Sequence, residues 1–244
     1  MPTFVLVHSP VVGPITWSIV ANELRRRHID ALTPSLLIDG PSAPPYWQHY
    51  ARAVARAVEA LPADRSLVLV GHSWSGLLLP AMRQGADHPV AAYLFVDAVV
   101  PERDGMSRFD LFNTPEEAEA IRQAASGGFT PNIWQNEAVL GAVGIEDAAL
   151  RQRFVAEVPS VPLALWEEPA PLFAGWPDAP CGYLAFSESK PRYQRSIGRA
   201  RTEGWAYAEL EGAHLHMLVD PPAVADALVD LAERMGIVVR EELR

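Results

Sequence analysis

The feature that most constrains the fold is an apolar run that leads directly into a tight turn and a helical pattern. Residues 67–70 are entirely apolar, the turn Gly-His-Ser-Trp follows at residues 71–74, and Ser75 and Gly76 open the next stretch. Such a run is typical of a parallel strand buried on both faces. A serine at a strand-to-helix turn sits on strained backbone with its hydroxyl at the top of the sheet. The segment predicts a parallel sheet and marks Ser73 as a candidate nucleophile.

The rest of the chain alternates in the same way. Short apolar runs lie at residues 4–7, 31–36, 92–96, 182–186 and 206–210. Amphipathic helical patterns lie at residues 17–27, 47–61, 77–84 and 223–235. This alternation predicts an α/β fold with a mostly parallel sheet flanked by helices. A length of 244 residues with 49% hydrophobic side chains suits one core, so we expect a single domain over residues 1–244.

The alternation stops between about residues 101 and 178. Helical patterns at 114–125 and 147–158 are separated by two glycines and followed by the proline-rich stretch 159–180. This segment is too short for its own core, so we predict a helical lid inserted after the strand that ends near Asp97. Its aromatic side chains indicate an apolar or aromatic small-molecule substrate. They are Phe109, Phe112, Phe129, Trp134, Phe154, Trp166, Phe173 and Trp176.

Composition and motifs exclude several functions. A formal net charge of −10 disfavours nucleic acid and anionic membranes as partners. The single cysteine, Cys181, cannot form an internal disulfide, and we take it as a core thiol. We find no His-x-x-x-His pair, no glycine-rich phosphate loop, no signal peptide and no apolar run long enough for a membrane span. We expect a cytoplasmic protein without metal or cofactor, and the oligomeric state cannot be read from the sequence.

A histidine suited to activate Ser73 follows the last expected strand. His214 and His216 lie in the loop Glu-Gly-Ala-His-Leu-His-Met-Leu at residues 211–218, before a helix start at Asp220. In this class of fold the order along the chain is serine, acid, histidine. Either histidine could be purely structural.

Together these features resemble the α/β-hydrolase superfamily, and within it the small esterase and hydroxynitrile lyase branch. The likeness covers almost the whole chain: the first strand with His8, a tryptophan at position 17, the turn at residues 71–74, the strand end at 96–101, the insertion and the histidine loop. It implies the α/β-hydrolase fold. The family pattern of glycine, histidine, a hydrophobe and then Met-Leu assigns the general base to His214, with His216 as the rival.

The resemblance leaves the acid of the triad open. The family usually places an aspartate after the strand at 182–186, but Lys190 stands there, and Glu188 lies two residues earlier. Haloalkane-dehalogenase-like members carry the acid at the end of the preceding strand, where this chain has Asp97. We favour Asp97, with Glu188 as the alternative and the absence of a competent acid as a third reading.

The oxyanion-binding groups are also incomplete. One donor is expected to be the N–H of Trp74. The family takes the other from the third residue of the loop after the first strand, and here that loop reads His8-Ser9-Pro10. Pro10 has no N–H. Ser9 could compensate through its hydroxyl or N–H, the loop could shift register, or Pro10 could simply stiffen a loop in which another N–H donates.

These observations allow three functions. The first is hydrolysis of an ester or thioester through a Ser73 acyl-enzyme, with His214 as base. The second is a lyase, eliminase or cyclase that uses the same Ser–His pair for proton abstraction. The third is a binding protein that has the fold but no catalysis. Hydroxynitrile lyases of the branch carry a hydroxyl residue where Ser9 stands, which keeps the second reading open.

Overall fold

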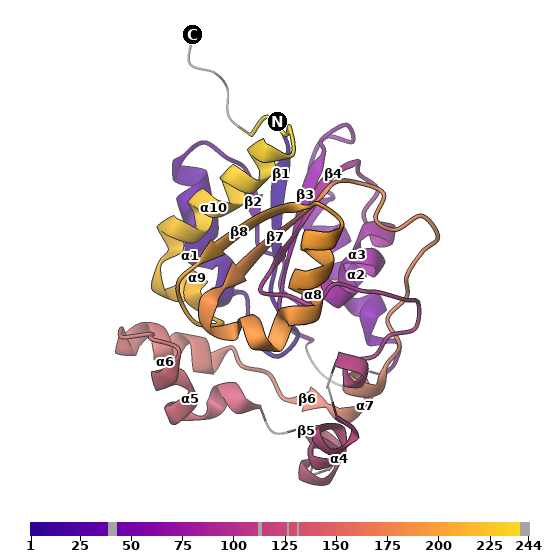
Figure 1. Ribbon diagram of the computed structural model, residues 1–244, viewed down its shortest axis with the longest axis vertical. Helices are drawn as coiled ribbons and strands as arrows, with labels where there is room; N and C mark the ends of the chain where they lie inside the picture. Colours follow the sequence, from indigo (N-terminus) through magenta and orange to yellow (C-terminus); the bar gives the residue numbers. More distant parts are fainter. Residues whose placement is uncertain (39–42, 112–113, 126, 131, 240–244) are drawn as a thin grey trace.

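A parallel sheet forms the centre of the molecule (Figure 1). The computed structural model describes residues 1–38, 43–111, 114–125, 127–130 and 132–239. Within these residues the sheet has six strands in the order β2-β1-β3-β4-β7-β8, and every pairing is parallel. The strands are β1 Thr3–Val7, β2 Ala31–Leu32, β3 Leu67–His72, β4 Val90–Val96, β7 Cys181–Phe186 and β8 Ala206–Leu210.

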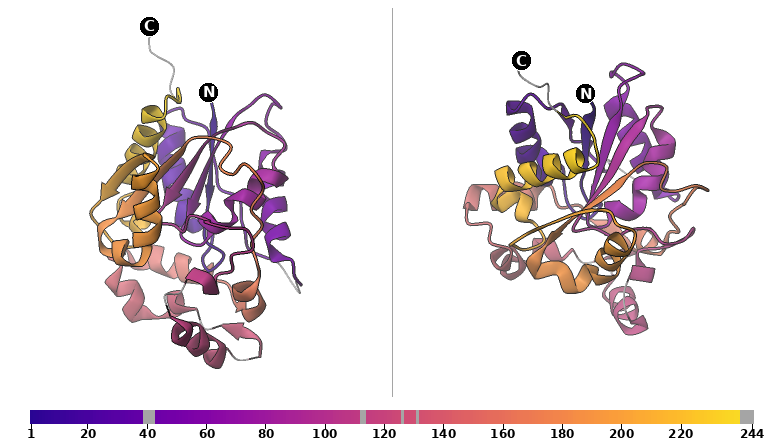
Figure 2. Two further views of the ribbon diagram at one scale, coloured as in Figure 1. Left: turned by 45° about the vertical axis from the view of Figure 1, so that its right-hand side comes forward. Right: turned by 45° about the horizontal axis from the view of Figure 1, so that its top comes forward.

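The central strands are apolar because both faces of the sheet are covered. Every residue of β1, β3 and β7 is buried. Helices α1 (Ile15–Arg26) and α10 (Pro221–Arg234) pack on one face, and α2 (Tyr46–Val58), α3 (Ser75–Gly85) and α8 (Lys190–Thr202) pack on the other (Figure 2). The short helix α9 (His216–Val219) precedes α10.

The strand order places a crevice at the carboxyl ends of β1 and β3. The chain leaves β1 toward β2 on one side and returns to β3 on the other. The loops that follow β1 and β3 therefore diverge, and ligands of open α/β sheets bind at such a switch point. The expected strand at 31–36 is shorter than predicted: only Ala31 and Leu32 pair with β1, and the chain then turns away.

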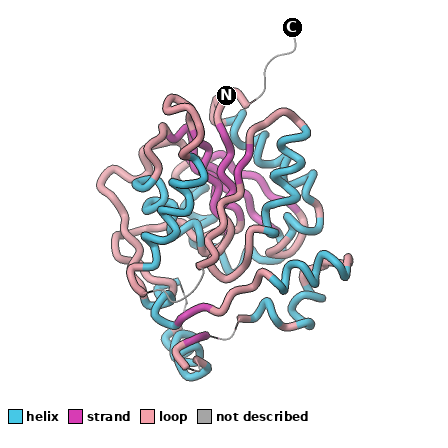
Figure 3. The backbone as a smooth tube through the Cα atoms, turned by 180° about the vertical axis from the view of Figure 1, so that it is seen from behind, coloured by secondary structure: helices cyan, strands magenta, loops and turns pink. Residues whose placement is uncertain are grey.

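The segment between β4 and β7 lies across the carboxyl ends of the strands, at the end of the molecule away from both chain termini (Figures 1 and 3). Its elements are short. They are η1 Phe109–Leu111, α4 Pro115–Ala124, β5 Phe129–Thr130, η2 Ile133–Gln135, α5 Glu137–Ala142, α6 Ala148–Ala156, β6 Val161–Pro162 and α7 Leu163–Glu167. The predicted helices at 114–125 and 147–158 correspond to α4 and α6. The antiparallel pair β5–β6 was not expected.

Two carboxylates of this inserted segment cap core helices. Glu157 accepts a hydrogen bond from the N–H of Ile15 at 2.7 Å, at the start of α1. Glu168 accepts from the N–H groups of Tyr46 and Trp47, at 2.6 and 2.9 Å, at the start of α2. The residue before each helix is a proline, which has no side chain that can cap. A negative charge there also complements the helix dipole, so these contacts fasten the insertion to the sheet domain.

Among the described residues, no helix combines the length and the apolar character needed to cross a bilayer.

Candidate active site

Ser73 lies at the turn between β3 and α3 on strained backbone. Its φ is 58°, a region that non-glycine residues seldom adopt. The strain is held by the end of β4: the N–H of Ser73 donates to the carbonyl of Val96 at 3.3 Å, and its carbonyl accepts from the N–H of Val99 at 3.1 Å. The turn thus fixes the serine above the sheet, as the sequence motif predicts.

The need for a small residue after the serine falls on Gly76 rather than on position 75. A Cβ atom on Gly76 would lie 2.2 Å from the carbonyl oxygen of Val99. Ser75 has a different part: it is fully buried, and its Oγ lies within hydrogen-bond distance of the carbonyls of Val7 and His72, at 2.9 and 2.8 Å. Position 75 therefore accepts a side chain, and the Ser75 hydroxyl braces the turn.

His214 faces Ser73 from the loop after β8. Its Nε2 lies 3.0 Å from Ser73 Oγ, and its Nδ1 lies 2.6 Å from Asp97 Oδ2. His72 lies behind it: the ring centroids are 4.5 Å apart, and His72 Nε2–H donates to the carbonyl of His214 at 3.0 Å. Burial holds the pKa of His72 well below its usual value, so this neighbour stays neutral and supports the ring without adding charge.

Asp97 is fully buried at the end of β4, and donors surround its carboxylate. Oδ1 accepts from the N–H of Phe186 at 3.2 Å. Oδ2 accepts from Ser189 Oγ at 2.5 Å and from His214 Nδ1. Its own φ is 45°, so a second strained residue stands at the site. Three donors thus satisfy the hydrogen-bonding capacity of this buried carboxylate.

A tyrosine holds the strained backbone after Asp97. Tyr183 Oη accepts from the N–H of Ala98 at 3.1 Å and donates to its carbonyl at 2.8 Å. Both partners belong to Ala98, so the phenol holds the two peptide units on either side of this residue and fixes the backbone next to Asp97.

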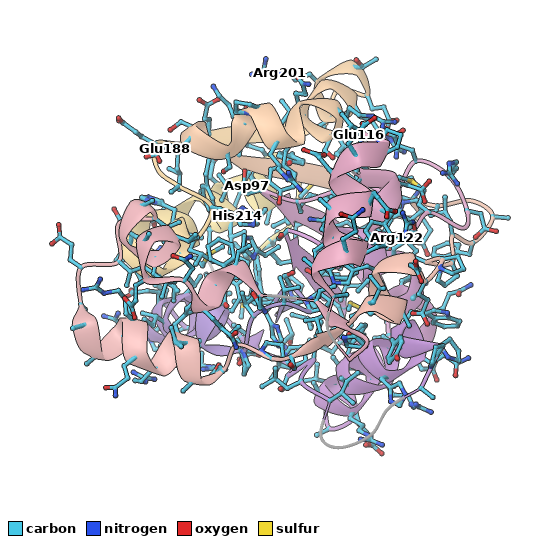
Figure 4. The ribbon with its side chains drawn as sticks, turned by 90° about the horizontal axis from the view of Figure 1, so that it is seen from below. Asp97, Glu116, Arg122, Glu188, Arg201 and His214 are labelled. Atoms are coloured by element: carbon cyan, nitrogen blue, oxygen red, sulfur yellow. The ribbon has the colours of Figure 1, made fainter. Side chains whose placement is uncertain are left out.

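The rival residues lie elsewhere (Figure 4). Glu188 is exposed and points away from Asp97 and His214, and only its backbone N–H contacts the histidine loop, at the carbonyl of Gly212. The ring of His216 packs against Phe186 instead, with centroids 5.5 Å apart. The structure therefore brings together Ser73, His214 and Asp97, and not Glu188 or His216.

Tyr193 is a member of the site that the sequence did not reveal. Its hydroxyl lies 3.2 Å from Ser73 Oγ and 3.4 Å from His214 Nε2, and its ring stacks on His214 at an interplanar angle of 18°. It occupies a kink in α8, where its φ and ψ of −108° and 15° leave the helical range. Burial and the nearby Asp97 carboxylate raise its pKa to about 12, so the phenol keeps its proton at neutral pH.

A cavity of about 430 Å³ opens above Ser73, between the sheet and the insertion. Its size suits a small organic ligand. Its described lining residues are Ser9, Val11, Ser73, Trp74, Arg108, Ile121, Thr130, Asn132, Ile133, Trp134, Val161, Trp166, Ser189, Arg192, Tyr193 and His214.

Of the eight aromatic residues singled out from the sequence, Trp134 and Trp166 are among the described residues that line this cavity. Trp134 stacks on His214 with centroids 5.9 Å apart. Phe154 supports Trp134 from behind, and Trp176 packs on Tyr93 outside the cavity. Phe112 lies outside the described residues.

A family model described as the alpha/beta hydrolase family matches residues 4–227. The chain belongs to the alpha/beta hydrolase family. Membership makes it an enzyme of the hydrolase class. The strand order of the sheet, the turn between β3 and α3 at Ser73 and the loop with His214 fit that family. A search of curated protein sequences found no match.

Solved structures show the same fold at low sequence identity. An extracellular alpha/beta-hydrolase from a Paenibacillus species is 21% identical with a TM-score of 0.76, covering 95% of this chain and 99% of that one. A pyrethroid hydrolase from Sphingobium faniae is 17% identical with a TM-score of 0.66, covering 95% of this chain and 97% of that one. A variant of tomato methylketone synthase I complexed with beta-ketoheptanoate is 16% identical with a TM-score of 0.72, covering 96% and 98%.

The loop after β1 presents Ser9 and Val11 to the cavity of this hydrolase-family site, and Pro10 is not among the lining residues. The N–H of Val12 donates to the carbonyl of Ser9 at 3.1 Å, which makes Pro10 the second residue of a β-turn, where proline is favoured. The Ser9 hydroxyl is buried and has no hydrogen-bond partner among the described residues. Two polar groups of this loop, the Ser9 hydroxyl and the Val11 N–H, remain candidates for contacting substrate beside the N–H of Trp74.

Over the described residues, no group of three or more His, Cys, Asp and Glu side chains is arranged to hold a metal ion. Cys181 is buried at the start of β7, and burial raises the pKa of its thiol to about 12.

Proposed function

We propose that this enzyme hydrolyses an ester or thioester of an apolar or aromatic small molecule through a Ser73 acyl-enzyme. One observation carries the proposal: an uninterrupted chain of contacts runs from Asp97 to His214 at 2.6 Å and from His214 to Ser73 at 3.0 Å, beneath the cavity. The catalytic roles of these residues are part of the proposal.

The geometry allows the usual order of proton transfers. Ser73 Oγ attacks the substrate carbonyl carbon while His214 Nε2 takes its proton. Asp97 holds the Nδ1–H of the imidazole, fixes its tautomer and stabilises the imidazolium. His214 then gives its proton to the leaving group, which departs as an alcohol from an ester or as a thiol from a thioester. Water, deprotonated by the same nitrogen, hydrolyses the acyl-enzyme and restores the serine.

Tyr193 adds a donor next to the reacting atoms. Its protonated phenol lies within reach of both Ser73 Oγ and His214 Nε2. In the free enzyme it orients the serine, and during the reaction it can donate to an oxygen of the tetrahedral intermediate. The Trp74 N–H, the Ser9 hydroxyl and the Val11 N–H are the remaining candidate donors for the developing oxyanion.

We further propose that the inserted segment acts as the lid that limits water entry and shapes the substrate site. It supplies Trp134, Trp166 and Asn132 to the cavity. Asn132 Nδ2 donates a hydrogen bond to the carbonyl of Val11, which connects the insertion to the loop after β1. The names of the pyrethroid hydrolase and of the Paenibacillus hydrolase support hydrolysis as the reaction. The cytoplasmic location expected from the sequence stays a prediction.

A second function is favoured by one specific observation. The buried, unpartnered hydroxyl of Ser9 could hold a substrate hydroxyl or carbonyl while His214 abstracts a proton, as a lyase, eliminase or cyclase would require. Methylketone synthase I, which shares the fold, is named for a reaction other than ester hydrolysis. This mechanism needs no acyl-enzyme.

The two functions differ in their response to changes in the loop after β1. The experiment measures turnover of 4-nitrophenyl butyrate, with both products quantified, for wild type, Ser9→Ala, Pro10→Ala and Ser73→Ala. A hydrolase releases butyrate and nitrophenol in equal amounts and loses this activity in Ser73→Ala. If Pro10 removes a needed donor, Pro10→Ala raises the rate, because a missing oxyanion donor costs about 10²–10³ in kcat. No hydrolysis above the Ser73→Ala background for this and longer esters would contradict the proposed function.

A further inference from the structure

Positively charged side chains line the cavity above Ser73. Its described lining includes two arginines, Arg108 and Arg192, and no aspartate or glutamate. Over the whole chain acidic residues outnumber basic ones by 30 to 20, so cations are the minority that would line a cavity by chance. The rest of the lining is mainly aromatic, aliphatic and hydroxyl-bearing.

Arg108 is held directly beside the nucleophile. Its guanidinium carbon lies 5.6 Å from the ring centre of Trp74, the residue after Ser73, and 5.1 Å from the ring centre of Trp166. The two indoles hold the guanidinium by cation–π contacts and so fix its position in the cavity lining. Burial lowers the pKa of Arg108 to about 10, so the group is charged at neutral pH although its surroundings disfavour the charge.

Arg192 brings a second positive charge to the same space. It precedes Tyr193 at the kink of α8, and its side chain is exposed at the cavity lining. Burial is the largest cause of the lowered pKa of Arg108, and the charge of Arg192 also contributes to lowering it. Glu117 of α4 attracts Arg108, but it does not line the cavity. Both arginines have further contacts within the protein. An anion in this cavity would be attracted by both guanidinium groups.

We propose that the substrate carries a carboxylate, which Arg108 and Arg192 bind while its ester or thioester carbonyl lies at Ser73. This inference rests on the proposed function for the position of the carbonyl, but the anion site itself rests on the two arginines. Arginine suits this role because its planar fork matches the two oxygens of a carboxylate. The substrate class is therefore an acidic ester with an apolar or aromatic body, such as a half-ester of a dicarboxylic acid or an acylated aromatic acid.

A binding experiment tests the anion site without catalysis. Calorimetric titration compares 3-phenylpropanoate with 3-phenylpropanamide, which has nearly the same shape but no charge, on the Ser73→Ala protein. We expect the carboxylate to bind at least about tenfold more tightly, and this preference to fall about tenfold when Arg108→Gln or Arg192→Gln is added. Equal binding of the acid and the amide, or a preference that survives both substitutions, would overturn the inference.

Matched controls come from the inserted segment, which contains Arg108, and from α8, which contains Arg192. Arg122 of α4 and Arg201 of α8 do not line the cavity (Figure 4). Arg122→Gln and Arg201→Gln should leave the acid-to-amide preference unchanged. Thermal unfolding of each variant separates a lost binding site from a lost fold.

A kinetic experiment then joins the anion site to the reaction. With Ser73 intact, we compare kcat/KM for two pairs: the mono-4-nitrophenyl ester of glutarate with its methyl-capped form, and 3-acetoxybenzoate with its methyl ester. A preference for the charged member in at least one pair that disappears in Arg108→Gln supports the inference. Brisk hydrolysis that favours the neutral member in both pairs overturns it. Carboxylate binding without hydrolysis of any of the four overturns the proposed function and leaves the anion site standing.

Discussion

The sheet domain and the insertion differ in how they are built and in what they bring to the site. The residues proposed for catalysis lie at strand ends or in the loop after a strand, on backbone fixed by the sheet. They are Ser73, Asp97 and His214. The residues proposed to select the substrate include Arg108 and Trp166. Both lie in the insertion, whose elements are short and are attached to the sheet domain by a few side-chain contacts. Rigid strand ends suit proton transfer, because it requires fixed distances. The short helices of the insertion can change in sequence without altering those distances.

The largest effect should come from the serine. Ser73→Ala removes the nucleophile and should lower kcat by about 10⁶, as in serine enzymes whose triad acts as a unit. Thermal unfolding should stay within a few degrees of wild type, because the hydroxyl contacts only His214 and Tyr193. A Ser73→Ala protein with more than a tenth of wild-type activity would break the assignment of chemistry to the sheet domain.

Two carboxylates give the next test. Asp97→Asn should lower kcat by about 10⁴, because an amide cannot hold the imidazole in the required tautomer or stabilise its charged form. Glu188→Gln serves as the matched control and should change kcat less than twofold, since the side chain is exposed. The measurement is the steady-state kcat of the two variants. A larger loss of kcat in Glu188→Gln than in Asp97→Asn would assign the acid of the triad to Glu188.

Tyr193→Phe should have an intermediate effect. Loss of one hydroxyl donor next to Ser73 Oγ should lower kcat by about 10- to 100-fold, with little change in KM. Because burial raises the Tyr193 pKa to about 12, the phenol stays protonated below that pH. The ratio of wild-type to variant rates should then be constant across the range from neutral to mildly alkaline pH. A ratio that changes with pH there would assign the proton transfer to Tyr193 itself.

The smallest effect concerns the attachment of the insertion. Glu157→Ala removes the cap on α1 and should lower the free energy of unfolding by about 1 kcal/mol, or about 2–4 °C in Tm. We expect KM to rise while kcat changes little, because Glu157 is remote from the triad. Glu157→Gln keeps an oxygen acceptor and should recover most of the stability. A drop in kcat with unchanged KM would contradict the separation of the two regions.

Sequence reasoning succeeded where one local pattern determines the structure. The apolar run, the glycine and the helix at residues 67–76 predict the turn at Ser73. The resemblance of the glycine–histidine loop to the family pattern led to His214 rather than His216. The choice of Asp97 over Glu188 needed the structure, since both follow strands and only the geometry shows which one faces the histidine.

The parts that the sequence did not reveal depend on non-local contacts. Helix α8 has few apolar residues and a kink, so its periodicity is weak, and Tyr193 and Ser189 were missed with it. The strands β5 and β6 have two residues each and pair across about thirty positions, which no local pattern encodes. The position of Arg108 in the cavity likewise depends on how the insertion folds back over the sheet, and Arg192 lies in the weakly patterned helix α8.

The most direct test of the central claim is covalent labelling of Ser73. The protein is incubated with a fluorophosphonate, and its intact mass is measured, followed by peptide mapping. The account predicts one adduct per chain, on Ser73, formed quickly by wild type, slowly by Asp97→Asn and not at all by Ser73→Ala. A wild-type protein that gains no mass, or whose adduct maps to another residue, would contradict the claim that Ser73 is the nucleophile of this hydrolase.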